Sequence, residues 1–508
     1  MKTVSKSSIV TLVLLCGLLI AGCKKHQDTT GSASSSGVAS SSGAVNSSGV
    51  PATFRDLRKL PGTVFDVTYT PNTVQIDLPA AQKCLKSVSD DGRVFVFECD
   101  DPRLQKLKEG AVMFLEHLGV RRVVAVHTDG AQIGIMTDTA ALTDFIQDGT
   151  IQFTVPVNFA ELQARNEPEM NLENELASDF PNWLSPPSVE AAEGNAKFSV
   201  HTKGETDGWE FEIEGEPEGD GLKLSLNAAK KKLPGMTPSV KVTGQLEHVS
   251  TAFKAVVHGG QMQNFNYSTP MKGHINVNWS VITMQPGSGI GEARLKLPPF
   301  AKDVFDIYGI PFLFKVDEAL IFKPGFGGKK DAAEGGFNVN YDGTSGVSIQ
   351  GQQSSPQGTM DAQPEAEKTT AESLAPHGVV LAVNAPKVSV SLGTESIKEA
   401  IKQAIPSGIS DKVGEFLEKG PFGGFFKSPK EDFFKIEGAA YVQLVTEFDY
   451  TGSGPLSIVP CSLTRLNFYA QAGADASAFA LKGESPKVNI KETHFVARQP
   501  DINACGEK

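Results

Sequence analysis

Hydrophobic and polar residues alternate along most of the chain, which is the pattern of half-buried β-strands. Residues 65–69 already alternate in this way, and longer runs such as 209–213 and 275–281 follow after residue 196. Alternation with period two places every second side chain on one face of a sheet. Turns rich in Gly and Asp separate the runs, as at Asp220-Gly221. The pattern predicts a mainly β protein, built of antiparallel sandwich or open-barrel domains with a few short helices.

Two short regions show helical spacing of apolar residues. In residues 140–147 the apolar side chains Leu142 and Phe145 lie one turn apart, and Asp138 or Thr139 is expected to cap the helix. In residues 394–419 apolar residues recur at helical spacing, and Pro406 divides that region into two short helices.

The N-terminus carries a short apolar run behind basic residues. Lys2 and Lys6 precede residues 9–20, a run of 12 residues. A membrane-spanning helix needs roughly 20 apolar residues, whereas the central region of a cleaved export signal needs only about 7–15. The run therefore predicts a signal peptide; an uncleaved anchor is the alternative.

The motif Ile20-Ala21-Gly22-Cys23 resembles the lipobox of bacterial lipoproteins. The resemblance implies that residues 1–22 are removed and that Cys23 becomes the first residue, acylated with diacylglycerol and palmitate chains. A plain secretory signal with an incidental cysteine is the alternative. The absence of Asp after Cys23 is similar to the pattern that sorts such proteins to the outer membrane. A lipid-anchored protein of the cell envelope is implied, with its periplasmic or surface-facing orientation left open.

Composition marks three segments that lack a strand pattern. Residues 31–50 are rich in Ser and carry Gly every six residues, which predicts a flexible tether. Residues 161–195 contain Pro among acidic residues and Asn, which indicates a connector between domains. Residues 352–376 are rich in Pro, Gln, Ala and Glu, and we expect this insertion to loop out unfolded.

These boundaries give an expected domain plan. We expect a signal peptide over 1–22, a lipidated N-terminus and disordered tether over 23–52, a small β-rich domain over 53–160, a connector over 161–195, a large β-rich domain over 196–500 that includes the insertion 352–376 and the helical segment 394–419, and a C-terminal tail over 501–508.

The chain is acidic, with a net charge of −12 at pH 7. Removal of residues 1–22 deletes Lys2 and Lys6 and makes the charge more negative. A nucleic-acid partner is therefore not expected, because phosphate backbones select basic proteins.

Cysteine usage predicts disulfides in an oxidising compartment. Four cysteines remain beside Cys23 after cleavage, so Cys84, Cys99, Cys461 and Cys505 should form two bonds, with three pairings possible. Proximity favours Cys84–Cys99 and Cys461–Cys505. If Asp91-Gly92 forms a two-residue hairpin turn, Cys84 and Cys99 face each other; residues 80–84 could equally form a helical turn.

A search for catalytic and metal-binding motifs finds little. The chain has no H-E-x-x-H and no G-x-S-x-G motif, and single histidines such as His258 and His274 are expected to be structural. The acid pairs at 90–91 and 100–101 could bind Ca²⁺ if the hairpin brings them together; solvated turn acids are the favoured alternative. We expect no catalytic residue, no cofactor and no resident metal.

Two further stretches bear on partners. Residues 109–153 are similar to a small β module of bacterial exported, adhesin-like proteins, a similarity that carries no chemical motif. Residues 421–434 gather five phenylalanines that could form a surface for a protein or hydrophobic partner, although inward packing is favoured. These are Phe422, Phe425, Phe426, Phe433 and Phe434.

Two function classes remain from the sequence. The preferred one is a membrane-anchored envelope lipoprotein that binds or scaffolds without catalysis. The alternative is an envelope hydrolase of glycan or peptide that uses dispersed acids. A carrier of a hydrophobic ligand becomes a third class if the sheets enclose an apolar cavity.

Overall fold

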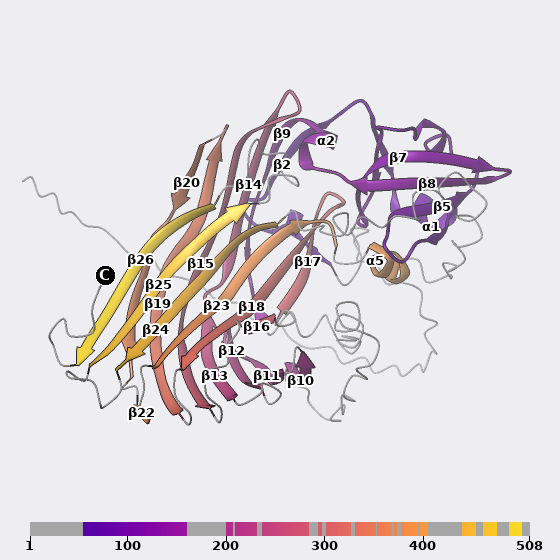
Figure 1. Cartoon of the computed structure of the whole chain (residues 1–508). Helices are drawn as coiled ribbons and strands as arrows, with labels where there is room; N and C mark the ends of the chain where they lie inside the picture. The colour runs from indigo at the N-terminus through magenta and orange to yellow at the C-terminus, as the bar shows by residue number, and fades with distance from the viewer. Residues whose placement is uncertain are drawn as a thin grey trace, which may run out of the picture. The chain divides into compact units, whose positions relative to one another are not determined.

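Three open β-sheets make up the described part of the chain in this computed structural model (Figure 1). The structure describes residues 54–159, 200–206, 209–230, 236–283, 293–296, 301–326, 331–351, 353–367, 370–372, 377–394, 397–404, 439–453, 461–474 and 487–499. The protein is mainly β, as the alternating pattern predicts. Within these ranges no helix has both the length and the apolar character needed to cross a membrane.

The largest sheet has twelve strands organised by β15 (Gln261–Thr283). Two strands share one edge of β15: its first part pairs with β14 (Ser250–His258), and its later part pairs with β13 (Met236–Glu247). The other edge of β15 pairs with β19 (Asp331–Gln350). The outer strands are β10 (Val200–Thr206), β11 (Trp209–Glu218) and β12 (Gly221–Lys230) beyond β13, and β9 (Ile146–Pro156) and β2 (Val64–Tyr69) beyond β14.

The segment 352–376, expected to loop out unfolded, contains three strands of this sheet. β20 (Gln353–Gln357), β21 (Met360–Ala366) and β22 (Thr370–Glu372) each pair antiparallel with β19. The polar composition misled the prediction because most of these side chains face solvent, while the backbone hydrogen bonds and the buried Met360 hold the segment to the sheet.

The second sheet has eight strands and is almost entirely antiparallel. Its order is β1 (Arg55–Asp56), β17 (Ala301–Ile307), β18 (Ile310–Phe326), β23 (His377–Leu392), β24 (Ala439–Gly452), β25 (Ser462–Ala474) and β26 (Lys487–Gln499), with β16 (Ala293–Lys296) also paired to β18. Only the β1–β17 pair is parallel among the pairs described for this sheet.

The two large sheets share one hydrophobic core and form a sandwich. Phe153 on β9 and Phe253 on β14 stack at 4.9 Å, and Phe312 on β18 meets them from the other sheet at 5.3 and 5.4 Å. Trp279 on β15 likewise lies 5.6 Å from Phe448 on β24. Contacts between aromatic rings across the layers add to the burial of apolar area. The alternating side chains of both sheets thus meet in the interior, as in other sandwiches.

The third sheet is a mixed six-stranded sheet, which we call the small module. Its order is β3 (Thr73–Ile76), β6 (Val112–Leu115), β7 (Gly119–Asp129), β8 (Gln132–Thr139), β5 (Val94–Glu98) and β4 (Leu85–Val88). Helix α1 (Leu78–Cys84) and the short 3₁₀ helix η2 (Leu104–Lys106) accompany it, whereas the 3₁₀ helix η1 (Leu57–Lys59) buries Leu57 in the core of the large sheets. Strands β2 and β9 leave this region to join the twelve-stranded sheet, so the segment 53–160 contributes to more than one sheet.

A helix from far along the sequence completes the core of the small module. Helix α5 (Ile397–Ala404) contributes Ile397, Ala400 and Ile401 to the same buried cluster as Phe95 and Phe97 of β5. Gly92, with φ of 62°, leaves the space that Ile397 occupies, since a Cβ atom there would overlap the Ile397 side chain. The apolar residues at helical spacing from residue 397 onward are therefore the face of α5 that is buried against the small module. Residues 405–419 of the expected helical segment lie outside the described ranges.

The helix expected over residues 140–147 is a single turn, α2 (Leu142–Phe145). Neither Asp138 nor Thr139 caps it, because both residues still belong to β8. Instead the Asp144 carboxylate accepts a hydrogen bond from the Ala141 amide at 2.8 Å.

Candidate functional site

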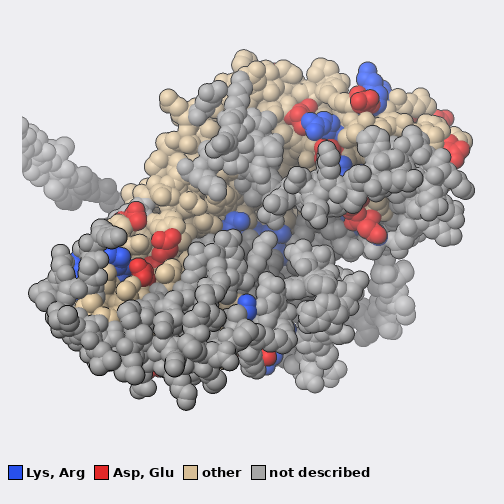
Figure 2. All heavy atoms as spheres, viewed as in Figure 1, with Lys and Arg blue, Asp and Glu red and all other residues tan. Residues whose placement is uncertain are grey.

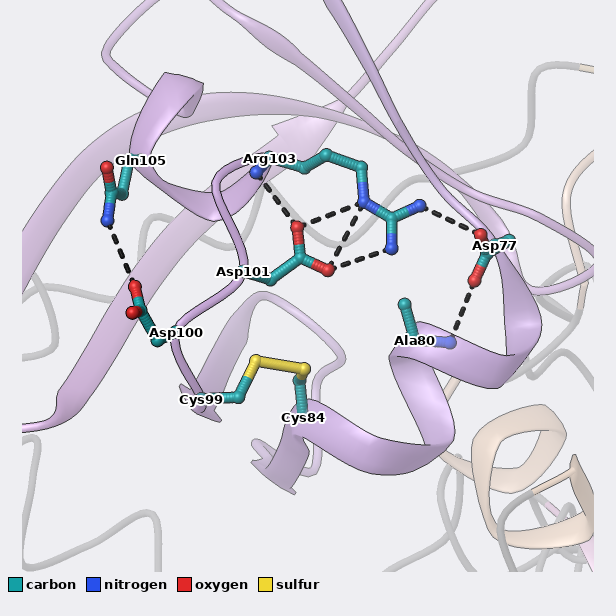
Figure 3. Close-up of a disulfide and its surroundings, with 8 residues drawn as sticks. All are labelled: Asp77, Ala80, Cys84, Cys99, Asp100, Asp101, Arg103 and Gln105. Carbon is teal, nitrogen blue, oxygen red and sulfur yellow. Dashed lines mark hydrogen bonds and ion pairs between the residues drawn. A yellow bond between two sulfur atoms is a disulfide. The ribbon is translucent and has the colours of Figure 1, made fainter.

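The disulfide Cys84–Cys99 forms as proximity predicts (Figure 3). Ser87 pairs with Val96 and Val88 with Phe95, which is the register that the expected hairpin implies. The two-residue turn considered at Asp91-Gly92 does not form, however. The Ser89 amide donates to the Val94 carbonyl and the Gly92 amide to the Ser89 carbonyl, so the loop is longer. Cys84 itself ends helix α1, the alternative that the sequence leaves open.

Beside the disulfide, Arg103 joins two carboxylates from different elements (Figure 3). Its guanidinium donates to Asp101 at 2.8 Å and to Asp77 at 2.9 Å, and the other oxygen of Asp77 caps α1 through the Ala80 amide at 2.8 Å. The hydrogen bonds from Arg103 lower the pKa of Asp101 to about 2 and also lower the pKa of Asp77. Both acids are thus held ionised, as structural partners of a fixed cation.

The acid pairs considered for Ca²⁺ are engaged with protein donors. Asp101 binds Arg103, and Asp100 accepts a hydrogen bond from Gln105 at 3.3 Å. Asp91 accepts from the Arg93 amide, and Asp90 forms an ion pair with Lys398 of α5. In the part of the chain that the structure describes, no three potential metal-ligating side chains come together.

The loop between β6 and β7 meets the turn between β17 and β18. The Nδ1 atom of His117 lies 2.8 Å from the Asp306 carboxylate, and the His117 amide donates to the Gly309 carbonyl at 2.7 Å. The Gly309 amide in turn donates to Asp306 at 3.1 Å. His117 and Tyr308 both take positive φ, 67° and 51°, which non-glycine residues adopt only where surrounding contacts hold them.

Gly309 is required at this junction by close approach. A Cβ atom added there would lie 3.3 Å from the Glu116 side chain and 3.3 Å from the ring of Phe114, and the φ of Gly309 is 87°. On the other side of the turn, Tyr308 stacks on Phe65 of β2 at 4.7 Å. The junction therefore joins the small module to strands of both large sheets.

Glu116, which precedes His117 at the junction, has a raised pKa. Burial raises it, while the neighbouring His117 opposes the shift. Tyr69 lies near Glu116, and burial, followed by the charge of Glu116, raises the pKa of Tyr69 to about 12. A carboxyl group with a raised pKa could act as a general acid if a substrate reached it. The neighbouring acids Asp77, Asp101 and Asp306 are engaged with Arg103 and His117, which favours a structural role for the cluster.

A pocket between the large sheets is small and apolar. Its volume is about 20 Å³, and it is lined by residues of β12, β13, β15 and β19 together with Pro386 of β23. Leu224, Leu246 and Ile275 are among the lining side chains. A space of this size holds about one water molecule. This pocket gives no support to the carriage of a hydrophobic ligand.

The outward face of β15, β19 and their neighbours is rich in amide and hydroxyl side chains, with charged residues such as Lys272 and Asp342 among them, and we call it the amide face. Asn278 donates to Asn276 at 2.7 Å, and Asn276 donates to Asn338 on the next strand. In a second group of hydrogen bonds, Gln357 on β20 donates to Asn266, and Asn266 donates to Asn264. The intervening side chains, such as Phe265 and Val277, are buried. The amide face is thus a polar surface fixed by a tightly packed core beneath it.

The structure places the remaining sequence-predicted residues apart from one another. His258 pairs with Asp148 at the surface at 2.7 Å, and His274 lies exposed on the amide face. Cys461 is disulfide-bonded, and Cys505 lies outside the described residues, so the Cys461–Cys505 bond stays a prediction. Cys23, Phe422, Phe425, Phe426, Phe433 and Phe434 also lie outside the described residues.

Sequence reasoning missed the junction of Glu116, His117 and Asp306. Asp306 lies 189 positions after His117 in the sequence. Only the Tyr308-Gly309 dipeptide between two apolar runs signals the turn that brings Asp306 to His117.

Together the geometry defines a mainly β protein of three open sheets. The family model "Domain of unknown function (DUF8403)" matches residues 59–148. The match covers the small module from β3 to β8 together with β2, α2 and the start of β9; it does not include α5. No curated protein and no solved structure matches the chain significantly.

Proposed function

We propose that this protein is a lipid-anchored component of the bacterial cell envelope that binds or scaffolds through the outer faces of its large sheets, without catalysing a reaction. The observation that carries the proposal is the amide face. It combines several strands of outward Asn, Gln, Ser and Thr side chains with a dense apolar interior. A rigid polar surface of this kind can form many hydrogen bonds to a partner without reorganising.

The anchor in this proposal is Cys23. The apolar run, the small residues Ala21 and Gly22 and the cysteine support acylation at this position. Several acyl chains on one residue anchor a protein stably, since each buried CH₂ contributes about 0.8 kcal/mol. The outer membrane is the proposed location.

Among the acids that the structure describes, the hydrolase alternative draws on Glu116, whose pKa is raised. A glycosidase needs a second carboxylate that faces the same bond, and the nearby Asp77 and Asp306 are held by Arg103 and His117. Because both of these carboxylates are engaged, neither is available beside Glu116 as the second acid that a glycosidase needs, and we prefer binding over hydrolysis.

Anchoring is tested by labelling cells with a palmitate analogue. The wild-type chain should incorporate the label and fractionate with membranes, and Cys23→Ala should do neither. Cys16→Ala is the matched control, because this cysteine lies within the proposed signal peptide and should leave labelling intact. Equal labelling of the Cys23→Ala chain would refute the anchor.

Binding is tested by photo-crosslinking in cells. A photoreactive residue is placed at Asn340 on the amide face, at His494 on the other large sheet, or at the exposed Ala131 in the β7–β8 turn as a control. We expect products of reduced mobility from at least one sheet position and none from Ala131. The absence of products from both sheet positions would contradict the proposal.

A further inference from the structure

The outward face of β24, β25 and β26 carries a continuous row of amides. Gln443 on β24 donates from Nε2 to Oε1 of Gln471 on β25 at 3.0 Å, and Gln471 donates to Asn489 on β26 at 3.3 Å. The three residues occupy paired positions on neighbouring strands, so their side chains stand on one face. The row still offers free donor and acceptor positions at each amide, because a primary amide has two N–H groups and two lone pairs.

Two tyrosines flank the row. Tyr441 lies two residues before Gln443 on β24, and Tyr469 lies two residues before Gln471 on β25. Both side chains are partly exposed. We call these five residues, Tyr441, Gln443, Tyr469, Gln471 and Asn489, the tyrosine face.

Packing holds the ring of Tyr441 along the sheet. Its cross-strand partner is Gly473, where a Cβ atom would lie 2.8 Å from Cζ of the ring. The absence of a side chain at Gly473 therefore makes room for the Tyr441 ring. In addition, the ammonium of Lys387 lies 5.3 Å from the centroid of this ring. A ring held by its neighbours loses little conformational entropy when a ligand packs on it.

Tyr469 is held by a different contact. Its hydroxyl donates to Oε1 of Glu447 at 3.2 Å, and burial together with Glu447 raises its pKa to about 12. The hydroxyl thus stays protonated over the physiological range, and the ring direction is defined by the hydrogen bond.

Charges around the tyrosine face are mixed in sign. Arg465 and Asp449 lie 3.6 Å apart, and Glu492 lies 3.6 Å from His494. Figure 2 shows blue and red atoms interspersed over the region of β24–β26. A surface without an excess of positive charge does not favour a polyanion.

We propose that the tyrosine face binds a neutral polysaccharide chain; this inference rests on the proposed binding function. The C–H faces of sugar rings pack on aromatic rings, and their hydroxyl groups both donate to and accept from amides. A protein partner would be favoured by an apolar centre surrounded by a polar rim, whereas here a row of amides separates the two rings.

The test is affinity electrophoresis of the full lipidated chain in detergent. Native gels contain hydroxyethyl cellulose or glycogen as neutral polysaccharides, or alginate as an anionic one. We expect at least one neutral polysaccharide to retard the chain and alginate to leave it unretarded. The double variant Tyr441→Ala, Tyr469→Ala should bind about tenfold more weakly, the effect expected when two ring contacts are lost.

Matched variants make the result specific. Tyr469→Phe keeps the ring and should retain most of the retardation, and Thr128→Ala with Asp129→Ala at the exposed end of β7 should leave it unchanged. Circular dichroism of each variant verifies folding. Absence of retardation in both neutral gels, retardation by alginate alone, or unchanged retardation of the double tyrosine variant would overturn the inference. Cross-linked products from Asn340 or His494 would then still uphold the proposed binding function, so the two failures are distinguishable.

Discussion

His117 and Asp306 meet at 2.8 Å although 189 residues separate them in the sequence. The Asp306 side chain is fully buried and that of His117 is 11% exposed. The contact therefore ties the small module to the eight-stranded sheet by a shielded hydrogen bond rather than by a solvated surface pair.

Loss of the Asp306 carboxylate should destabilise the protein. Asp306→Ala leaves His117 and the Gly309 amide without their acceptor, and buried groups left in this state cost about 2–4 kcal/mol. Urea unfolding monitored by tryptophan fluorescence measures the change. His258→Ala is the control, because the His258–Asp148 pair is exposed and its loss should cost less than about 1 kcal/mol. Equal effects of the two variants would contradict this account of the junction.

Removal of the disulfide should also lower stability. The bond closes a loop with a sequence separation of 15 residues, and such a loop contributes about 3 kcal/mol in the chain-entropy model. The double variant Cys84→Ala, Cys99→Ala should therefore unfold at a lower urea concentration than the oxidised wild type. Peptide mapping without reductant should recover Cys84 and Cys99 in one linked species; a link from either one to Cys461 would disprove this pairing.

Acid should destabilise the fold through Asp101. Its pKa is about 2 in the folded protein, against the ordinary value of 3.8 for an unperturbed Asp. Because the folded state binds this proton less tightly, the contribution of Asp101 to stability is present above pH 3.8 and is lost as the pH falls toward 2. Asp101→Asn should flatten the dependence of the urea midpoint on pH within this window. Parallel curves for the wild type and the variant would show that the Arg103 contact has no energetic role.

Helix α5 should be needed for the stability of the small module. Ile397→Ala removes a buried side chain from its core, which costs about 2–4 kcal/mol where the site cannot collapse. Limited proteolysis should then cut the chain faster at the small module than in the wild type. Asp90→Asn is the control, since Asp90 is 94% exposed in its ion pair with Lys398. Unchanged proteolysis of the Ile397→Ala chain would mean that the helix does not stabilise the module.

Local patterns in the sequence predicted the fold class well but not the partners of each strand. Alternation identified the strands because burial of one face is encoded residue by residue. The pairing of 353–366 with β19 escaped prediction, since a solvent-facing edge strand needs few apolar side chains. The hairpin register was correct although its turn was not, because a longer loop centred on the same residues preserves the pairing of Val88 with Phe95.

The junction and the tyrosine face were beyond sequence reasoning for a different reason. His117, Asp306 and Gly309 belong to loops whose proximity depends on how three sheets pack. Gln443 and Gln471 occupy ordinary outward positions of alternating strands, and only the strand register places them side by side. A single sequence contains the residues of such sites but not the pairing that assembles them.

The position of α5 in the chain has a consequence for the order of folding. The six strands of the small module are all synthesised before residue 140, yet Ile397 and Ile401 complete its core. The module must therefore remain unfinished, with part of its apolar interior open, until most of the polypeptide has emerged. Apolar surface and strand edges that stay open during synthesis favour aggregation, so late closure exposes this module to it.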